Sequence, residues 1–480
     1  MGPRQLFANQ EHKYVALGEH KERPLTDRRW SKSFLLFITT ITLVAFAALV
    51  FIFGRPSPHG DAPASCDTIY HGYQCQNDIS HYWGQYSPYF LVPSDISDDV
   101  PNGCSITFAQ ILSRHGARDP TASKTAQYNA TIHKLQANVK NFTGPYAFLA
   151  DYEYRLGADQ LTVFGQQELV NSGIKYYDRY KELASRLVPF VRSSGQARVV
   201  ESAQNWTQGF HAAKLANQVS KYADAAYPYP IVVIPETDVC NAFENGSDGN
   251  IASKAQAQWA AVFIPPIRTR INAALPGANL TVMETVHMMD LCPFNTVASP
   301  NGTISGFCAL FTEEEWHQYG CWVQQRAHCS LDQQSVDDES STNHTLDGSN
   351  DTFPLGRRLY ADFSHDNDMT AIFSALGLYN RTTGHLPNTT VTEAPQANGY
   401  SAAWTVPFAA RAYFEKMQCR RRPEELVRVI VNDRVLPLTQ CDGDRLGRCT
   451  LDAFVDSLGF VRGGGDWGRC FVGKYASHFG

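Results

Sequence analysis

The sequence predicts an α/β protein in which a large sheet domain carries an inserted, smaller helical subdomain and follows a single transmembrane helix. Three features support this prediction: two strand-to-loop-to-helix units, a long stretch of helical periodicity, and one uncharged apolar run near the N-terminus. Of the 480 residues, 43% are hydrophobic, which is enough to bury a sizeable core.

The first strand-to-helix unit begins at residues 104–112, CSITFAQIL, which have the apolar character of a buried strand. This strand leads directly into the loop Arg114-His115-Gly116. Beyond Pro120 the pattern becomes helical, because apolar residues recur at intervals of three or four: Tyr128, Ile132, Leu135 and Val139.

The second unit begins with a predicted strand at 357–363, RRLYADF, which leads to His365 and Asp366. A helix is predicted to follow at 370–378. Open α/β sheets place their ligand sites at the C-terminal ends of the strands. The two units therefore each deliver one histidine, His115 and His365, to a single candidate site.

Between residues 162 and 271 helical patterns dominate, and we interpret this stretch as partly a helical subdomain inserted over the sheet. Two short strands are predicted within it, at 198–200 and 231–234. Nearer the C-terminus, 426–431 and 435–438 flank a short polar turn, as the two strands of a hairpin do.

The apolar run at 34–53 carries no charge and has the length of about 20 residues that a helix needs to cross a bilayer. Basic residues cluster just before it, so the positive-inside rule places the N-terminus in the cytosol. We therefore predict a cytosolic tail at 1–33, a signal anchor at 34–53, a linker at 54–65 and one extracellular or lumenal domain at 66–480. Cleavage after 62–64, which would release a secreted form, stays an open alternative.

All ten N-glycosylation sequons and all 12 cysteines lie beyond the apolar run. This one-sided distribution indicates N-linked glycans and disulfides formed in an oxidising compartment. The cysteine spacing fits no zinc site, so no metal is expected. A net charge of −6 offers no basic surface for nucleic acid, and we expect a monomer. The sequons are at Asn129, Asn141, Asn205, Asn245, Asn279, Asn301, Asn343, Asn350, Asn380 and Asn388.

Residues 114–120 read R-H-G-A-R-D-P, a pattern with a direct chemical interpretation for phosphate esters. Guanidinium groups such as those of Arg114 and Arg118 fork onto phosphate oxygens and stabilise the charge of the transferred group. The neutral imidazole of His115 is a nucleophile near and below neutral pH, and a phosphohistidine divides one difficult step into two. Gly116 allows the backbone to approach the phosphate closely.

The dipeptide His365-Asp366 supplies the remaining chemistry that such a reaction needs. An alcohol oxygen is a poor leaving group unless it is protonated, and a carboxyl group that faces a phosphate anion has a raised pKa. Asp366 fits the role of this acid, and His365 can donate a hydrogen bond to phosphate. An isolated His-Asp pair is also typical of a solvated surface, but its place after a second strand favours the catalytic interpretation.

These motifs and several further segments resemble the histidine acid phosphatases, and among them most closely the fungal phytases. The resemblance covers residues 66–470 and includes SCDTIYHGYQC, SHYWGQYSPYF, FVRSSGQARVV, FIPPIRTRI, LYADFSHDN and VNDRVLPL. It implies hydrolysis of phosphomonoesters, foremost inositol hexakisphosphate (phytate), without a cofactor. A broad-specificity acid phosphatase and a catalytically impaired, glycosylated surface protein stay open as alternatives.

The same resemblance implies the roles of individual residues. Around the nucleophile His115 and the acid Asp366 it implies a phosphate clamp of Arg114, Arg118, Arg192 and His365. It assigns to the substrate site Gln85, Tyr86 and Thr121, with Lys124 as a more peripheral phosphate contact. It further implies five disulfides: Cys66–Cys75, Cys104–Cys419, Cys240–Cys470, Cys292–Cys308 and Cys441–Cys449.

One stretch departs from the family pattern. After FTEEEW, phytases continue through a glycine-containing helical stretch that carries a phosphate-contacting lysine, whereas this chain proceeds to 320–322 and lacks most of that stretch. The residues at 324–332 can be encoded by codons that, read one base later, give N-S-E-L-I-A-R-L-T. This suggests a gene-model or splicing error at 320–336, with genuine divergence as the alternative. As written, the sequence leaves Cys321 and Cys329 outside the five implied disulfides, and a product of this reading is expected to misfold or to bind phytate less well than its relatives.

Overall fold

The structure is a computed structural model that describes residues 65–217, 227–234, 250–333, 354, 356–379, 390–397 and 399–463. The predicted cytosolic tail, the signal anchor and nearly all of the linker lie outside these ranges. No helix within the ranges has the length and apolar character needed to cross a membrane.

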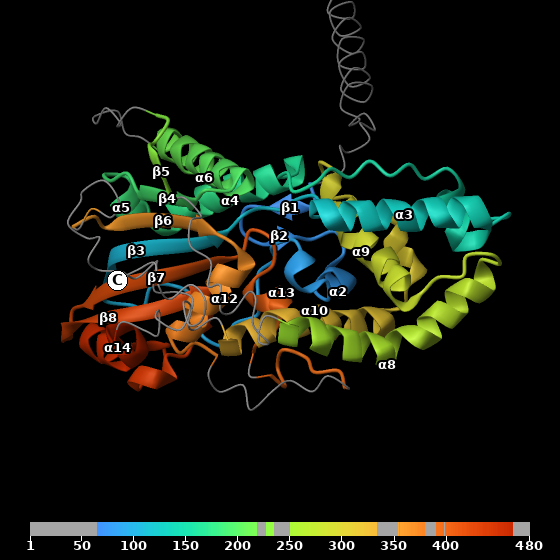
Figure 1. Ribbon diagram of the computed structural model, residues 1–480. Coiled ribbons are helices and arrows are strands. Elements are labelled where there is room, and N and C mark those ends of the chain that lie inside the picture. The colour runs from blue at the N-terminus through green and yellow to red at the C-terminus, as the bar shows by residue number, and fades with distance from the viewer. Residues whose placement is uncertain are drawn as a thin grey trace, which may run out of the picture. The chain divides into compact units, whose positions relative to one another are not determined.

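Eight strands of the described chain form one mixed sheet around β3 (Cys104–Arg114) (Figure 1). On one side of β3 lie the parallel strands β6 (Leu359–Ser364), β4 (Phe190–Ser194) and β5 (Ile231–Ile234). On the other side lie the antiparallel strands β7 (Arg411–Cys419), β8 (Arg422–Val431), β9 (Arg434–Leu436) and β10 (Arg448–Thr450). The predicted strand at 231–234 and the predicted β8–β9 hairpin are confirmed.

The register between β3 and β6 positions the candidate site. The two strands run in parallel with Arg114 opposite Ser364, and the backbone N–H of His115 donates to the carbonyl oxygen of Ser364 at 3.1 Å. The segments that follow β3 and β6 therefore leave the sheet side by side, at the C-terminal ends of the two strands. This places His115 next to His365, as the sequence predicts.

Two long helices, α4 (Val163–Arg179) and α6 (Ala197–Ala216), pack against each other and cover one face of the sheet (Figure 1). The predicted strand at 198–200 is wrong, because these residues belong to α6. Val199 is buried together with Ala203 and Trp206, at the spacing of one helix face. The core under the two helices includes Leu169, Tyr176, Trp206, Phe210, Ile111, Val191 and Phe363.

The other face of the sheet is covered by α12 (Asp366–Ala375) and α14 (Leu451–Ser457). The helix predicted at 370–378 is thus confirmed, but it begins earlier, directly after His365. Leu112 packs on this face, whereas its neighbour Ile111 packs on the first, as expected for successive strand residues. The core on this side includes Met369, Phe373, Ala412, Val429 and Phe454.

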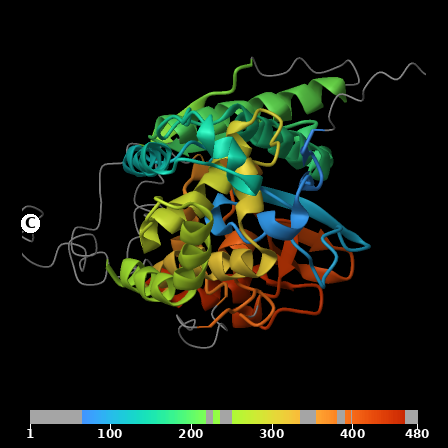
Figure 2. The same ribbon diagram turned by 90° about the vertical axis from the view of Figure 1, so that its right-hand side faces the viewer.

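The helical subdomain consists of four long helices that share an apolar core (Figures 1 and 2). They are α3 (Ala122–Asn138), α8 (Ile251–Ala274), α9 (Val282–Ala298) and α10 (Glu313–Gln333). The apolar face predicted for α3 is buried there. As predicted, the stretch 162–271 is only partly a helical subdomain: α8 begins within it and belongs to the subdomain, whereas α4 and α6 bury their apolar faces against the sheet.

Short elements connect these layers, and one of them, η1 (Gly84–Tyr86), carries the predicted substrate-site residues Gln85 and Tyr86. The others are β1 (Asp67–Thr68), β2 (Gly72–Tyr73), α2 (Asn77–Ser80), η2 (Gly144–Ala150), α5 (Lys181–Ala184), η4 (Gly306–Leu310), α13 (Ala402–Thr405), η7 (Thr439–Cys441) and α15 (Gly459–Arg462).

Four of the five predicted disulfides are formed: Cys66–Cys75, Cys104–Cys419, Cys292–Cys308 and Cys441–Cys449. The bond between Cys104 and Cys419 ties the start of β3 to the end of β7 across a sequence separation of 315 residues. Such a long closed loop restricts the unfolded chain strongly. The fifth predicted pair, Cys240–Cys470, lies outside the described residues. Cys321 is a buried free thiol.

Candidate active site

The candidate site lies where β3 and β6 end, and its two histidines face each other there. The ring centroids of His115 and His365 are 5.6 Å apart. His115 is buried and follows β3, while His365 directly precedes the first residue of α12. Two segments separated by about half the chain therefore supply one site.

His115 is held in the tautomer that a nucleophile requires. Its Nδ1 lies 2.8 Å from the carbonyl oxygen of Gly116. A carbonyl oxygen only accepts hydrogen bonds, so Nδ1 carries the proton and Nε2 keeps its lone pair. Burial lowers the pKa of His115 well below its ordinary value, and the nearby charges of Arg114 and Arg118 lower it further. The imidazole thus stays neutral in mildly acidic solution.

Arg114 is fully buried beside His115, and the surrounding backbone fixes its guanidinium. Nη1 donates to the carbonyl oxygens of Gln85 and Val406, the latter at 2.8 Å. Its Cζ lies 4.8 Å from the ring centre of Phe408. Nε and Nη2 have no hydrogen-bond acceptor among the described residues, although Nη2 lies 3.1 Å from Oδ2 of Asp366. This edge of the guanidinium therefore faces the Asp366 carboxylate, with which an incoming anion would compete.

Two further arginines are fixed near the same strand ends. Arg118 donates from Nη1 to the carbonyl oxygen of Asp119 at 2.8 Å, and its buried Nε has no acceptor among the described residues. Nε of Arg192, on β4, lies 2.5 Å from Oδ1 of Asp362 on β6. Oδ2 of Asp362 accepts from Gln110 at 2.6 Å. This pairing anchors Arg192 against the neighbouring strand.

His365 is oriented by partners on both of its ring nitrogens. Nδ1 lies 3.2 Å from Oδ2 of Asp368, and Nε2 lies 3.0 Å from Oε1 of Gln196. The Asp368 carboxylate also accepts from the backbone N–H of His365, which closes a capping box at the start of α12. Although burial acts to raise the pKa of Asp368, the hydrogen bonds and charge of His365 lower it. Both ring nitrogens of His365 therefore face oxygen atoms of neighbouring side chains.

The loop that carries His115 is fixed from behind by α4. A Cβ atom on Gly116 would lie 2.3 Å from the carbonyl oxygen of Gly165, so only glycine fits there. The buried carboxyl group of Glu168 accepts the backbone N–H of Ala117 at 2.8 Å and that of Tyr89 at 3.0 Å. Burial raises the pKa of Glu168 to about 8, and the nearby Asp67 adds to this effect. One carboxyl group thus joins two loops that frame the site.

The other residues predicted for the substrate site lie on η1 and at the start of α3. Gln85 is buried, and its Oε1 has no partner among the described residues. The ring of Tyr86 packs against Phe294, with 4.8 Å between ring centroids. Thr121 immediately precedes α3, and Lys124 lies in the first turn of that helix.

Lys124 is already engaged by a buried carboxylate of the helical subdomain. Its Nζ lies 3.6 Å from Oδ2 of Asp290 on α9. Asp290 also accepts from the hydroxyls of Tyr128 at 2.6 Å and Tyr319 at 2.5 Å. A phosphate group that reached Lys124 would therefore compete with Asp290 for the positive charge of the lysine.

The stretch that departs from the family pattern begins within α10, and its first residues pack against η1. Trp322 and Val323 are buried, and a Cβ atom on Gly84 would lie 2.5 Å from Cγ1 of Val323. Sγ of Cys321 accepts the backbone N–H of Thr392 at 3.2 Å. Up to Val323 the chain thus forms part of the core behind η1.

The sequence motifs did not indicate several residues that complete the site. Gln196, which contacts His365, and Arg198 lie where β4 passes into α6. They lie at the strand-to-helix junction of a third such unit. Ligand sites form at the C-terminal ends of strands, so this position is a signal by which the sequence could have indicated both residues. Phe408 and Glu168 carried no such signal, because they reach the site through packing with distant parts of the chain.

Comparison with known proteins places this geometry in context. The model of the histidine phosphatase superfamily (branch 2) matches residues 105–331 and 322–432. Phytase A of Aspergillus oryzae is 48% identical over 443 residues, which cover 85% of this chain and 94% of that protein. Phytase A of Aspergillus fumigatus is 45% identical over 471 residues, which cover 90% of this chain and 100% of that protein.

Solved structures share the fold. The phytase from D. castellii superposes with a TM-score of 0.67 at 23% identity, covering 82% of this chain and 87% of that chain. The multiple inositol polyphosphate phosphatase of Bifidobacterium longum, in complex with inositol hexasulfate, has a TM-score of 0.51 at 14% identity, covering 79% of this chain and 97% of that chain.

Proposed function

This chain belongs to branch 2 of the histidine phosphatase superfamily and is a phosphomonoester hydrolase, and we propose that it acts on phytate through a phosphohistidine at His115. The observation that carries the proposed mechanism is the state of His115. Its Nδ1 proton is held by the Gly116 carbonyl, which leaves Nε2 with the free lone pair, and the nearby charges of Arg114 and Arg118 act on the same ring.

In the first step, Nε2 of His115 attacks the phosphorus atom and forms a P–N bond as the P–O bond to the alcohol breaks. Asp366 donates its proton to the departing oxygen, which leaves as a neutral alcohol. Arg114, Arg118 and Arg192 stabilise the negative charge on the transferred phosphoryl group. The negative charge of the bound phosphate favours the protonated form of Asp366 before transfer.

In the second step, a water molecule attacks the phosphorus atom and the P–N bond breaks. The Asp366 carboxylate takes a proton from this water, and inorganic phosphate is released. His115 regains its lone pair on Nε2, and Asp366 regains its proton, so both groups return to their initial states. The two steps consume one water for each phosphate released.

Phytate is the proposed substrate because the curated relatives at 45–48% identity are named phytase A. A broad-specificity acid phosphatase is the second candidate. The sequence departure around 320–336 favours it, since the phosphate-contacting lysine expected there from the family resemblance is missing. The ratio of activities toward phytate and toward a small aryl phosphate distinguishes the two candidates.

We also propose that the catalytic domain lies outside the cytosol, behind a single N-terminal anchor and with N-linked glycans. The four disulfides support this location, because such bonds persist in oxidising compartments. A non-permeant protease applied to intact cells, and to cells whose plasma membrane alone is permeabilised, tests it. We expect an extracellular domain to be digested in intact cells, or a lumenal domain to stay protected in permeabilised cells while the N-terminal tail is digested. Digestion of the catalytic domain together with the tail only after permeabilisation would reject it.

The decisive experiment is phosphate release from phytate by the full-length chain in detergent, measured across acid pH beside a His115→Ala variant. We expect release by the native protein and none above background by the variant. Alkaline quench of the native protein during turnover should trap a phosphate on the chain that is stable to alkali and is released by acid. Release by the variant at the native rate would reject His115 as the nucleophile.

A further inference from the structure

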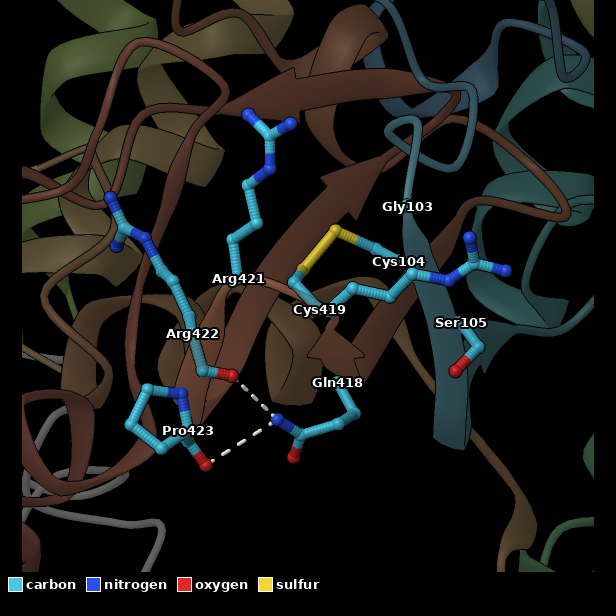
Figure 3. Close-up of a pocket in the computed structure, with 9 residues that line it drawn as sticks. Gly103, Cys104, Ser105, Gln418, Cys419, Arg421, Arg422 and Pro423 are labelled. Carbon is cyan, nitrogen blue, oxygen red and sulfur yellow. Dashed lines mark hydrogen bonds between the residues drawn. A yellow bond between two sulfur atoms is a disulfide. The ribbon is translucent and has the colours of Figure 1, made fainter.

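A hollow lies at the end of the sheet opposite the catalytic site, around the hairpin that joins β7 to β8 (Figure 3). Cys104, at the start of β3, pairs with Cys419, at the end of β7, whereas Ser113 pairs with Arg411 near the catalytic end. The 11 residues of β3 separate the two ends, and ten steps of about 3.3 Å span roughly 33 Å. The hollow is therefore distinct from the active site.

Three consecutive arginines, Arg420, Arg421 and Arg422, line this hollow. All three are exposed, and none of their guanidinium groups has a hydrogen bond or ion pair within the described part of the chain. In Figure 3 the side chains of Arg421 and Arg422 extend from the hairpin in the same direction. Their positive charge contrasts with the net charge of −6 of the whole chain.

The acidic groups nearby do little to neutralise these arginines. Glu425 is paired with Lys416 at 2.8 Å, and Asp444 is paired with Arg448 at 2.8 Å. Glu424 is the remaining exposed carboxylate of this stretch. Counting Arg420, Arg421 and Arg422 against Glu424, the hairpin keeps an excess of two positive charges.

The backbone of the hairpin is held rigidly, so the arginines start from fixed positions. The Cys104–Cys419 disulfide forms part of the wall of the hollow. The backbone N–H of Arg420 donates to the carbonyl oxygen of Gly103 at 2.9 Å. Nε2 of Gln418 donates to the carbonyl oxygen of Arg422 at 2.8 Å. A rigid base reduces the entropy lost when the arginines bind a ligand.

We propose that this hairpin is a second anion site, which binds a small molecule that carries several neighbouring phosphate or sulfate ester groups. Guanidinium groups bind such esters through paired N–H donors, and adjacent arginines favour a multivalent anion over a single one. The site is separate from the catalytic centre and does not depend on the proposed reaction.

The test is calorimetric titration of the full-length chain in detergent with inositol hexasulfate, whose sulfate esters are not phosphate substrates. The test variant is R420Q/R421Q/R422Q. The control variant K140Q/R186Q/K254Q removes the same charge from three scattered, exposed cations. Inorganic sulfate at matched ionic strength is titrated in parallel. Activity toward a small aryl phosphate, expected to equal the native value in both variants, confirms that they are folded.

We expect two binding events in the native protein and in the control. In the hairpin variant the second event should weaken by about tenfold or more, while the catalytic-site event remains. Equal isotherms for the native protein and the hairpin variant would overturn the proposal. So would an equal loss in the control variant, or binding of inorganic sulfate as tight as that of the hexasulfate. If the triple variant fails to fold, R421Q alone must weaken the second event, or the site is rejected.

Discussion

Oδ2 of Asp366 lies 3.1 Å from Nη2 of Arg114, so the proposed acid and the proposed phosphate clamp are in contact before substrate binds. Bound phosphate must compete with Asp366 for this guanidinium. The competition moves positive charge away from the carboxyl group and brings negative charge toward it, and both changes favour a proton on Asp366. Substrate binding thus prepares the acid for the leaving group.

Replacing the acid by its amide tests this relationship. The substitution Asp366→Asn should lower kcat for phytate by about 10²–10⁴-fold, because an alkoxide leaves poorly without a proton. The loss for an aryl phosphate with a stable phenolate leaving group should be much smaller. His115→Ala is the matched control and should abolish both activities. Equal losses of Asp366→Asn on the two substrates would contradict the role of Asp366 as the acid.

The close packing behind the nucleophile predicts a steric effect at Gly116. A Cβ atom there would meet the carbonyl oxygen of Gly165 at 2.3 Å, so Gly116→Ala should displace the loop of His115. We expect a loss of about 1–3 kcal/mol in the free energy of unfolding. We also expect a lower kcat, because the displaced loop carries His115. Gly459→Ala is the control, since nothing lies within 4 Å of its Cβ position. Similar unfolding curves for the two variants would contradict the packing.

The local sequence predicts the strand ends of this fold better than the layers around them. Arg114 and His115 were identified because an apolar run precedes a motif with phosphate chemistry, and the same holds for His365. The amphipathic patterns of α4 and α6 show that one face is buried, but not what covers it. Both helices bury that face against the sheet, whereas α8, which begins in the same predicted stretch, belongs to the helical subdomain.

The remainder of the site depends on contacts between distant segments, which a local pattern does not contain. Val406 and Gln85 orient Arg114 through backbone carbonyl oxygens, and any residue type supplies such an oxygen. Arg192 resembles a surface arginine until β4 is placed beside β6 and its partner Asp362. The family resemblance was therefore needed for Arg192, Gln85 and Tyr86.

The buried carboxyl group of Glu168 predicts a pH-dependent stability difference. Burial raises its pKa to about 8 in the folded protein, above its ordinary value of 4.5. The folded state thus binds more protons than the unfolded state between these values, and the contribution of Glu168 to stability falls as pH rises through them. In the variant Glu168→Gln this fall is absent. The free energy of unfolding of the variant relative to native should rise by about 1 kcal/mol or more from pH 5 to pH 8.

The readout for Glu168 is the slope of this difference against pH, measured by urea unfolding. A constant offset from the changed hydrogen bonds to Ala117 and Tyr89 does not affect the slope. Glu201→Gln, on the less buried surface of α6, is measured in parallel as the control for removing a carboxyl group. Parallel pH curves for native protein and Glu168→Gln would show that Glu168 ionises normally in the fold.

The last prediction concerns the stretch at which the chain departs from its family. If residues 320–323 are a genuine part of the folded protein, the side chain of Val323 packs against Gly84 of η1. Val323→Ala should then lower the free energy of unfolding by about 1–3 kcal/mol and raise KM for phytate, because η1 carries Gln85 and Tyr86. Val163→Ala, at a position that is 58% exposed, removes the same two methyl groups without a cavity and should change neither quantity. Equal stability of the two variants would mean that α10 does not pack behind η1, and would favour a gene-model error, which sequencing of the transcript across 320–336 then checks.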